Sequence, residues 1–480
     1  MQSVFRSSRV WVWLLAAALI VITLFLLNEW NKDTIEQSFE GKAKLRDSGR
    51  VLSDVVNAPI GAPVLLSKLA SSSGFTPQTR MGFTSGDQWE PAIAADRFGH
   101  VYILYPQYNG VPGCAACASP TMIWQMSSDH GQSWTVPTIM FSAGDTQGQW
   151  DAQIVVDPVD GKTVYAAWLQ NNKSSIEVAK STDFGTTWTY VLADSTNAGV
   201  DKDIIAVRGQ DVYVVYNHAQ TVLAAASHDG GVTFTEVRVN QNAKLGWSLA
   251  GGGTVTPDGS VYFSWAGYTQ NGGAKGPVNL YVSKSSNGGK SWATNLVDVS
   301  GAPPDCSSMN CGWAFLGAQM TMTSGAGGNL YLLWNSGSTA AGPERIYFAK
   351  STDGGSTWSS KADVSSAPVG TQHAFPALAS GGTNDVRITW MDARAASTVG
   401  GIDRWNVYYR NSTDGGNTWS GETDLSTYVS GYSYIFTNGF SFPFGDYFEM
   451  DVDEQGTTHA VWGEGLNYNT PGSIWYSQGK

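Results

Sequence analysis

The sequence predicts an all-β fold in which similar four-stranded sheets repeat along the chain. Three observations predict it: an eight-residue phrase that recurs six times, a two-strand pattern that recurs seven times, and a composition rich in Gly and Trp. Of the 480 residues, 55 are Gly and 20 are Trp, whereas charged residues make up only 14%. This composition is typical of a large β-domain with many tight turns.

The eight-residue phrase has the form S-x-D-x-G-x-T-W. Its third residue, Asp or Asn, can bond the backbone amides of a tight turn, and its fifth residue, Gly, supplies the positive φ that such a turn requires. The closing aromatic residue packs beneath the turn. Each copy therefore predicts a hairpin corner. The copies span 127–134, 181–188, 227–234, 285–292, 351–358 and 412–419.

The second pattern sets the number of sheets. It consists of a short apolar strand, a Gly or Asp turn and a strand of the form V-Y-x-x-W, and its copies begin at Ala92, Ile154, Ile204, Gly253, Met320, Ala377 and Met450. A period of roughly 45 to 65 residues with one four-stranded unit in each period is typical of a β-propeller.

We therefore predict seven blades. The seventh blade lacks an outer strand of its own, and we expect a strand within 74–84 to complete it and close the ring. Six blades remain the alternative if the last hairpin packs on another blade.

The phrase resembles the Asp box, or BNR repeat, of sialidase-like β-propellers, and the resemblance extends from Trp89 to the end of the chain. In that family the box is structural and sialidases have six blades. The resemblance therefore implies a structural role for Asp129, Asp183, Asp229, Asn287, Asp353 and Asp414.

Sialidase activity is not implied by the same resemblance. Sialidases bind the sialate carboxylate with three arginines, the first in a Phe/Tyr-Arg-Ile-Pro motif, and they use an Asp acid and a Tyr nucleophile supported by Glu. The expected first position here reads Trp89-Glu90-Pro91-Ala92, and Arg-Ile-Pro occurs nowhere. An acid stands where the family has a base, so we leave open whether the chain is an enzyme.

In a propeller the innermost strand of each blade begins at the mouth of the central channel, and functional loops usually lie there. Acidic and aromatic residues dominate that ring in this sequence. They could bind and cleave a carbohydrate, or they could fill the channel and bond loop amides. The catalytic candidates are Glu90, Asp151, Asp392, Arg394, Tyr447 and Glu449, and the binding candidates are Trp89, Trp150, Trp247, Trp313 and His373.

The connection spanning 428–448 is unusually aromatic and predicts either a loop folded over the disk or a docking surface for a partner or a membrane. Its binding candidates are Tyr432, Tyr434, Phe436 and Phe440.

The N-terminal segment predicts a membrane anchor. An apolar run follows Arg6 and Arg9, is about long enough to span a bilayer, and is followed by no small-x-small cleavage motif. The leading arginines place the N-terminus in the cytoplasm and the rest in the periplasm or outside the cell. A long cleaved signal peptide is the alternative. The predicted divisions are a cytoplasmic end at 1–9, the anchor at 10–28, a stalk at 29–75 and the propeller at 76–480.

The cysteines occur in two close pairs, Cys114 with Cys117 and Cys306 with Cys311, which predict two local disulfides in an oxidising compartment. No His accompanies either pair, so we expect no shared zinc and no haem. We assign no cofactor and no other metal, and a Ca²⁺ at the acidic mouth stays open although no loop there has recognisable ligand spacing. The net charge of −12 excludes a nucleic-acid binder.

Two functions remain. The first is a non-catalytic binding, scaffold or assembly subunit of a larger membrane complex, with protein partners; seven-bladed Asp-box propellers of this type resemble photosystem assembly factors. The second is a membrane-tethered, sialidase-like glycoside hydrolase acting on surface glycans.

Overall fold

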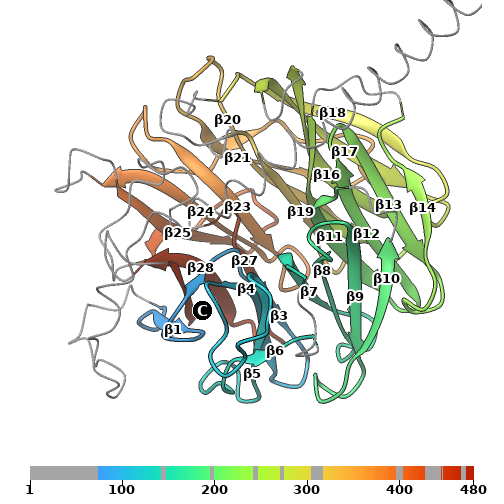
Figure 1. The fold of residues 1–480 in the computed structure, drawn as a ribbon. Helices are drawn as coiled ribbons and strands as arrows, with labels where there is room; N and C mark the ends of the chain where they lie inside the picture. Colours follow the sequence, from blue (N-terminus) through green and yellow to red (C-terminus); the bar gives the residue numbers. More distant parts are fainter. Residues whose placement is uncertain are drawn as a thin grey trace, which may run out of the picture.

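The structure is a computed structural model that describes residues 74–141, 147–194, 199–241, 247–270, 275–303, 317–395, 404–426, 445, 447–465 and 472–480. Within these residues it contains strands and no helices, and the strands form seven antiparallel sheets arranged in a ring (Figure 1). The predicted all-β, seven-bladed propeller is confirmed, and the six-bladed alternative is wrong. No helix in the described ranges is long and apolar enough to cross a membrane. The predicted anchor at 10–28 lies outside these ranges.

The strands of each blade are given from the innermost outward. Blade 1 contains β2 (Asp87–Gln88), β3 (Ala92–Ala95), β4 (Val101–Tyr108), β5 (Thr121–Ser127) and β6 (Thr138–Ile139). Blade 2 contains β7 (Trp150–Val156), β8 (Val164–Gln170), β9 (Ser175–Ser181) and β10 (Thr189–Asp194). Blade 3 contains β11 (Asp201–Arg208), β12 (Asp211–His218), β13 (Thr221–Ser227) and β14 (Thr235–Arg238).

The next three blades repeat the same order. Blade 4 contains β15 (Trp247–Val255), β16 (Val261–Gln270), β17 (Lys275–Ser285) and β18 (Ala293–Ser300). Blade 5 contains β19 (Met320–Ser324), β20 (Leu330–Ser336), β21 (Arg345–Ser351) and β22 (Ala362–Asp363). Blade 6 contains β23 (His373–Ala379), β24 (Val386–Ala395), β25 (Arg404–Ser412) and β26 (Thr423–Asp424).

Blade 7 joins the two ends of the described chain. It contains β27 (Glu449–Val452), β28 (Thr458–Gly465), β29 (Gly472–Gly479) and, as its outermost strand, β1 (Thr79–Met81). β1 pairs with β29 in antiparallel register, and Phe75 forms a further bridge to Gly479. Figure 1 shows the C-terminus beside β1. The expected strand within 74–84 is therefore present, and it pairs along the outer edge of β29 as the fourth strand of blade 7.

The second strand of every blade contributes one large aromatic residue to the core. The aromatic residue that ends the V-Y-x-x-W pattern is fully buried in all seven blades. The seven are Tyr105, Trp168, Tyr216, Trp265, Trp334, Trp390 and Trp462. The five indole N–H groups each donate to a nearby oxygen, as buried polar groups must. In three blades that oxygen belongs to the residue two positions later, namely Gln170, Asp392 and Glu464.

The six recurrent phrases form six similar corners. In every copy the amide of the fifth-position Gly donates to the first Ser hydroxyl at 2.8 or 2.9 Å. The seventh-position amide donates to the Asp or Asn side chain at 2.8 to 3.1 Å. At Asp129, bonds from Ser133 and Ser127 lower the carboxyl pKa to about 2. The Ser and Asp or Asn side chains of each phrase therefore bond within their own turn.

The fifth-position glycines also join neighbouring blades. Their φ lies between +77° and +86°, and each packs on an aromatic side chain of the preceding blade. A Cβ added at Gly416 would lie 2.2 Å from Phe348, and one at Gly131 would lie 1.9 Å from the Tyr476 hydroxyl. The corners therefore set how closely the blades pack.

Candidate functional site

The innermost strands enclose a central cavity of about 610 Å³. At the end where these strands begin, its wall carries charged and polar side chains: Asp151, Lys202, Asp203, Tyr447 and Glu449. We call these five residues the channel mouth. They come from blades 2, 3 and 7, so the ring closure brings together positions that are remote in the sequence.

The backbone is strained where the innermost strands begin. Glu90, Asp151, Lys202 and Phe375 all have φ between 54° and 55°, and the register of β7, β11 and β23 shifts at this point. A left-handed conformation costs about 1–2 kcal/mol for a residue with a side chain. Such bulges redirect side chains and are frequent near functional sites. Here they mark the rim of the channel in four blades.

Two lysines balance the acids of blades 2 and 3. The Lys202 amide donates to Asp151 at 2.9 Å, and the Lys202 ammonium lies 3.9 Å from the same carboxylate. The Lys173 ammonium lies 3.1 Å from Asp201. Burial disfavours an ionised Asp151, but Lys202 and Lys173 outweigh it and lower the Asp151 pKa. Asp151 is therefore an ionised carboxylate beside two ammonium groups.

Asp203 has a different environment from Asp151. Its side chain is 1% exposed, and neither carboxylate oxygen has a hydrogen-bond partner among the described residues. Burial, together with the charge on Asp151, raises its pKa well above the usual value. A buried carboxyl group without a partner is costly in free energy. Among the described residues of the channel mouth, Asp203 is therefore the carboxyl whose two oxygens are both left without a hydrogen bond.

The blade 7 residues of the channel mouth are held by backbone groups. The Tyr447 hydroxyl donates to the Ala152 carbonyl at 3.2 Å. Glu449 accepts from the Ile93 amide at 3.2 Å and from Gln153 Nε2 at 2.7 Å. Burial raises the pKa of Glu449 to about 8, and burial with nearby carboxylates raises that of Tyr447 well above its usual range. Both groups therefore hold their protons at neutral pH.

The aromatic candidates of the ring serve different roles. Trp89 is buried and stacks on Tyr108, with ring centroids 4.6 Å apart. Trp150 is half-buried and packs beneath the Lys173 ammonium, which lies 5.6 Å from its ring centroid. Trp247 begins β15. Glu90 is also buried, and Gly445 packs against it so closely that a Cβ there would lie 2.4 Å from Glu90 Cγ.

The blade 6 candidates lie away from the channel wall. Asp392 accepts from the Trp390 indole and pairs with Arg394, whose guanidinium also pairs with Glu422. His373 is fully buried. Its Nδ1 lies 2.9 Å from the Glu344 carbonyl, and its Nε2 lies 2.8 Å from the Ser365 hydroxyl. Asp392 and Arg394 thus form a scaffold ion pair, and His373 fills the boundary between blades 5 and 6.

Several candidates fall outside the described residues. They are Trp313, Tyr432, Tyr434, Phe436, Phe440, Cys306 and Cys311. Cys114 and Cys117 form a disulfide in the connection between β4 and β5.

Sequence reasoning did not single out Lys173, Lys202 or Gln153, which complete the electrostatics of the site. In the sequence Lys202 stands between two acids of the predicted ring, Asp201 and Asp203, and this alternation of charge could have indicated it. Lys173 carries no such signal, because it comes from the β8–β9 turn and reaches the site only through the fold.

No family model matches the chain, and no curated protein matches it. Among solved structures it is similar to a protein of unknown function from Dyadobacter fermentans, with 12% identity, a TM-score of 0.48, and coverage of 85% of this chain and 99% of that one. It is also similar to the Hadza microbial sialidase Hz136, with 15% identity, a TM-score of 0.43, and coverage of 82% and 66%. It is similar as well to YCF48 bound to D1 peptide, with 13% identity, a TM-score of 0.43, and coverage of 85% of this chain and 98% of that one. The fold assignment rests on the seven sheets themselves.

Proposed function

We propose that this chain is a non-catalytic binding propeller, held at a membrane outside the cytoplasm, that contributes a partner-binding face to a larger membrane complex. One observation carries the proposal: the groups suited to catalysis are engaged by the scaffold. Glu449 accepts two hydrogen bonds, Asp151 is neutralised by Lys202, and Arg394 is held between two carboxylates. The membrane attachment rests on the apolar run at 10–28.

The tyrosine chemistry also favours binding over catalysis. A phenol nucleophile needs a lowered pKa or an adjacent base that takes its proton. The pKa of Tyr447 is raised by burial and by the surrounding carboxylates, and its hydroxyl donates to a backbone carbonyl. Asp203 remains as a buried recognition group on the channel wall. A partner that inserts a hydrogen-bond donor or a cation there would satisfy it.

Gentle detergent extraction of the full chain tests the proposal. We expect it to co-elute with membrane subunits on a sizing column, and we expect Lys202→Gln together with Asp203→Asn to weaken that association. Arg208→Gln is the matched control, because Arg208 lies on the same strand at the opposite end of the cavity. A chain that always elutes alone, or variants that all behave alike, would contradict the proposal.

A glycoside hydrolase is the second candidate, because the channel mouth combines protonated and ionised acids. Glu449 has a raised pKa and Asp151 a lowered one, the division of roles expected of a general acid and its partner. A screen with fluorogenic glycosides separates the two functions. Turnover that disappears in Asp151→Asn and Glu449→Gln, but not in Arg208→Gln, would establish the enzyme instead.

A further inference from the structure

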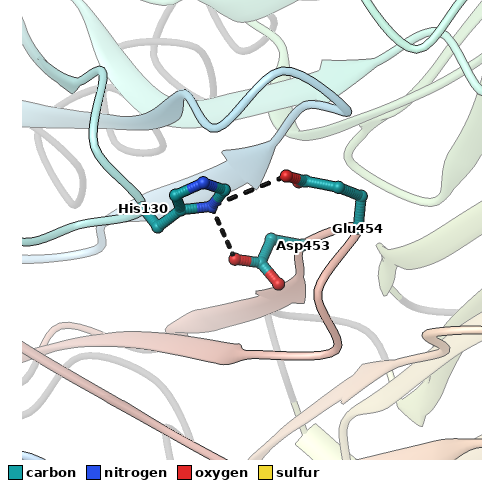
Figure 2. A group of neighbouring side chains, drawn as sticks. All are labelled: His130, Asp453 and Glu454. Atoms are coloured by element: carbon teal, nitrogen blue, oxygen red, sulfur yellow. Dashed lines mark hydrogen bonds and ion pairs between the residues drawn. The ribbon is translucent and has the colours of Figure 1, made fainter.

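A group of metal-ligating side chains lies at the boundary where blade 7 meets blade 1. His130 belongs to the first recurrent phrase, after β5, whereas Asp453 and Glu454 occupy the turn between β27 and β28. Figure 2 shows the imidazole of His130 facing both carboxylates. The two segments are 323 residues apart in the sequence and meet only because the ring closes.

The spacing of the three donor atoms fits a small divalent cation. His130 Nδ1 lies 3.2 Å from an Asp453 oxygen and 3.6 Å from a Glu454 oxygen, and all three atoms lie within 4.8 Å of one another. Zinc bonds to nitrogen and oxygen of about 2.0–2.2 Å place tetrahedral ligands roughly 3.4 Å apart. We propose that His130, Asp453 and Glu454 bind a zinc-like divalent cation that links blade 1 to blade 7. The sequence alone had led us to expect no metal.

Asp453 is held in place for this role by its own turn. One of its oxygens accepts from the amides of Gln455 and Thr457, at 3.0 and 2.7 Å. The other oxygen, which faces His130, also lies 3.3 Å from His459 Nε2, and the other ring nitrogen of His459 lies 2.7 Å from the Tyr476 hydroxyl. The Asp453 side chain is 1% exposed. Such outer contacts fix a ligand's orientation before a metal arrives.

Gln455 provides the matching contact for His130. Its side-chain nitrogen lies 2.9 Å from His130 Nε2, so Nε2 accepts a hydrogen bond and Nδ1 carries the imidazole proton in the metal-free arrangement. A cation on Nδ1 would require the other tautomer, with the proton on Nε2, and the Gln455 amide could turn over to present its oxygen as the acceptor.

The donor set identifies the class of cation. One imidazole and two carboxylates suit zinc and similar transition metals, whereas Ca²⁺ requires six to eight oxygens. The His130 and Glu454 side chains are 27% and 30% exposed, which leaves room for a water or an outside ligand in a fourth position. The proposal does not depend on the function proposed above.

The test is titration of the full-length chain with Zn²⁺, followed by calorimetry and by the unfolding temperature with and without chelator. We expect one cation per chain, a higher unfolding temperature that chelator reverses, and at least about tenfold weaker binding in His130→Gln and Glu454→Gln. His228→Gln is the control. His228 also pairs with one carboxylate, Asp211, and contacts the next blade, but no second acid joins it among the described residues.

Co²⁺ binding gives an independent readout, because four-coordinate Co²⁺ has visible absorption that a plain ion pair lacks. Glu454→Gln removes only an exposed ligand, so it keeps the test valid if His130→Gln fails to fold. Absence of Zn²⁺ binding, or binding equally strong in His130→Gln, Glu454→Gln and wild type, would show that these residues form only a hydrogen-bonded ion pair.

Discussion

Replacing Glu449 with Gln tests whether the channel mouth holds protonated acids. Burial raises the Glu449 pKa from 4.5 to about 8, against the bonds from Ile93 and Gln153. The folded protein therefore keeps a proton that the unfolded chain releases. The stability this proton provides is complete below about pH 4.5 and is lost as the pH rises to about 8. Gln cannot ionise, so the variant should lack this loss.

The magnitude follows from the two pKa values. At about 1.4 kcal/mol per pH unit, a change from 4.5 to about 8 sets an upper bound of about 5 kcal/mol. Between about pH 5 and about pH 8.5 the wild type should lose most of this bound, about 3–4 kcal/mol. Gln153 can turn over and accept from the new amide where it now donates, at the loss of its bond to the Ala152 carbonyl, which still accepts from Tyr447.

Urea unfolding of both proteins at about pH 5 and about pH 8.5 measures the effect. We expect similar midpoints at the lower pH and a more stable variant at the higher pH. Asp451→Asn is the companion variant. Burial raises the pKa of Asp451 only to about 6, so the stability gained by this variant over the wild type should reach its full value near pH 6. A wild type that loses no stability relative to Glu449→Gln between the two conditions would refute the reasoning.

Three further predictions concern the scaffold, each measured by chemical unfolding. Gly416→Ala should cost about 2–4 kcal/mol and Gly259→Ala only about 1, because both have positive φ but only the first Cβ would meet a neighbouring blade; equal losses would contradict the packing argument. Gly251→Ala should be more destabilising than Gly327→Ala, since its Cβ would lie 2.0 Å from the Met320 carbonyl whereas Gly327 has open space. Asp353→Asn should be milder than Asp353→Ala, because Asn287 makes the equivalent turn bonds in blade 4.

The architecture was predictable because its signals are local. The V-Y-x-x-W strands place one buried aromatic in each blade, and the recurrent phrase contains every group that its own corner needs. Repetition of these two patterns predicts the number of blades. Because the seventh copy lacks its own outer strand, it also predicts that an N-terminal strand completes that blade, as β1 does.

The site was predictable only in part. Position at or just before the start of the innermost strands singled out Asp151, Tyr447 and Glu449, and these three line the central cavity. Asp392 was singled out from the end of the second strand of blade 6, and its carboxylate accepts from the Trp390 indole. Asp392 lies on β24, one strand outward from the channel-lining β23, so the order of strands in the blade keeps it from the channel.

The sequence by itself determined the repeat and the fold class, since each depends on residues close together in the chain. The tertiary structure alone decided which acids are neutralised, which carboxyl has no hydrogen-bond partner among the described residues, and that His130 meets Asp453. Those outcomes depend on backbone bulges and on contacts between blades, and therefore on groups that the chain separates by up to hundreds of residues.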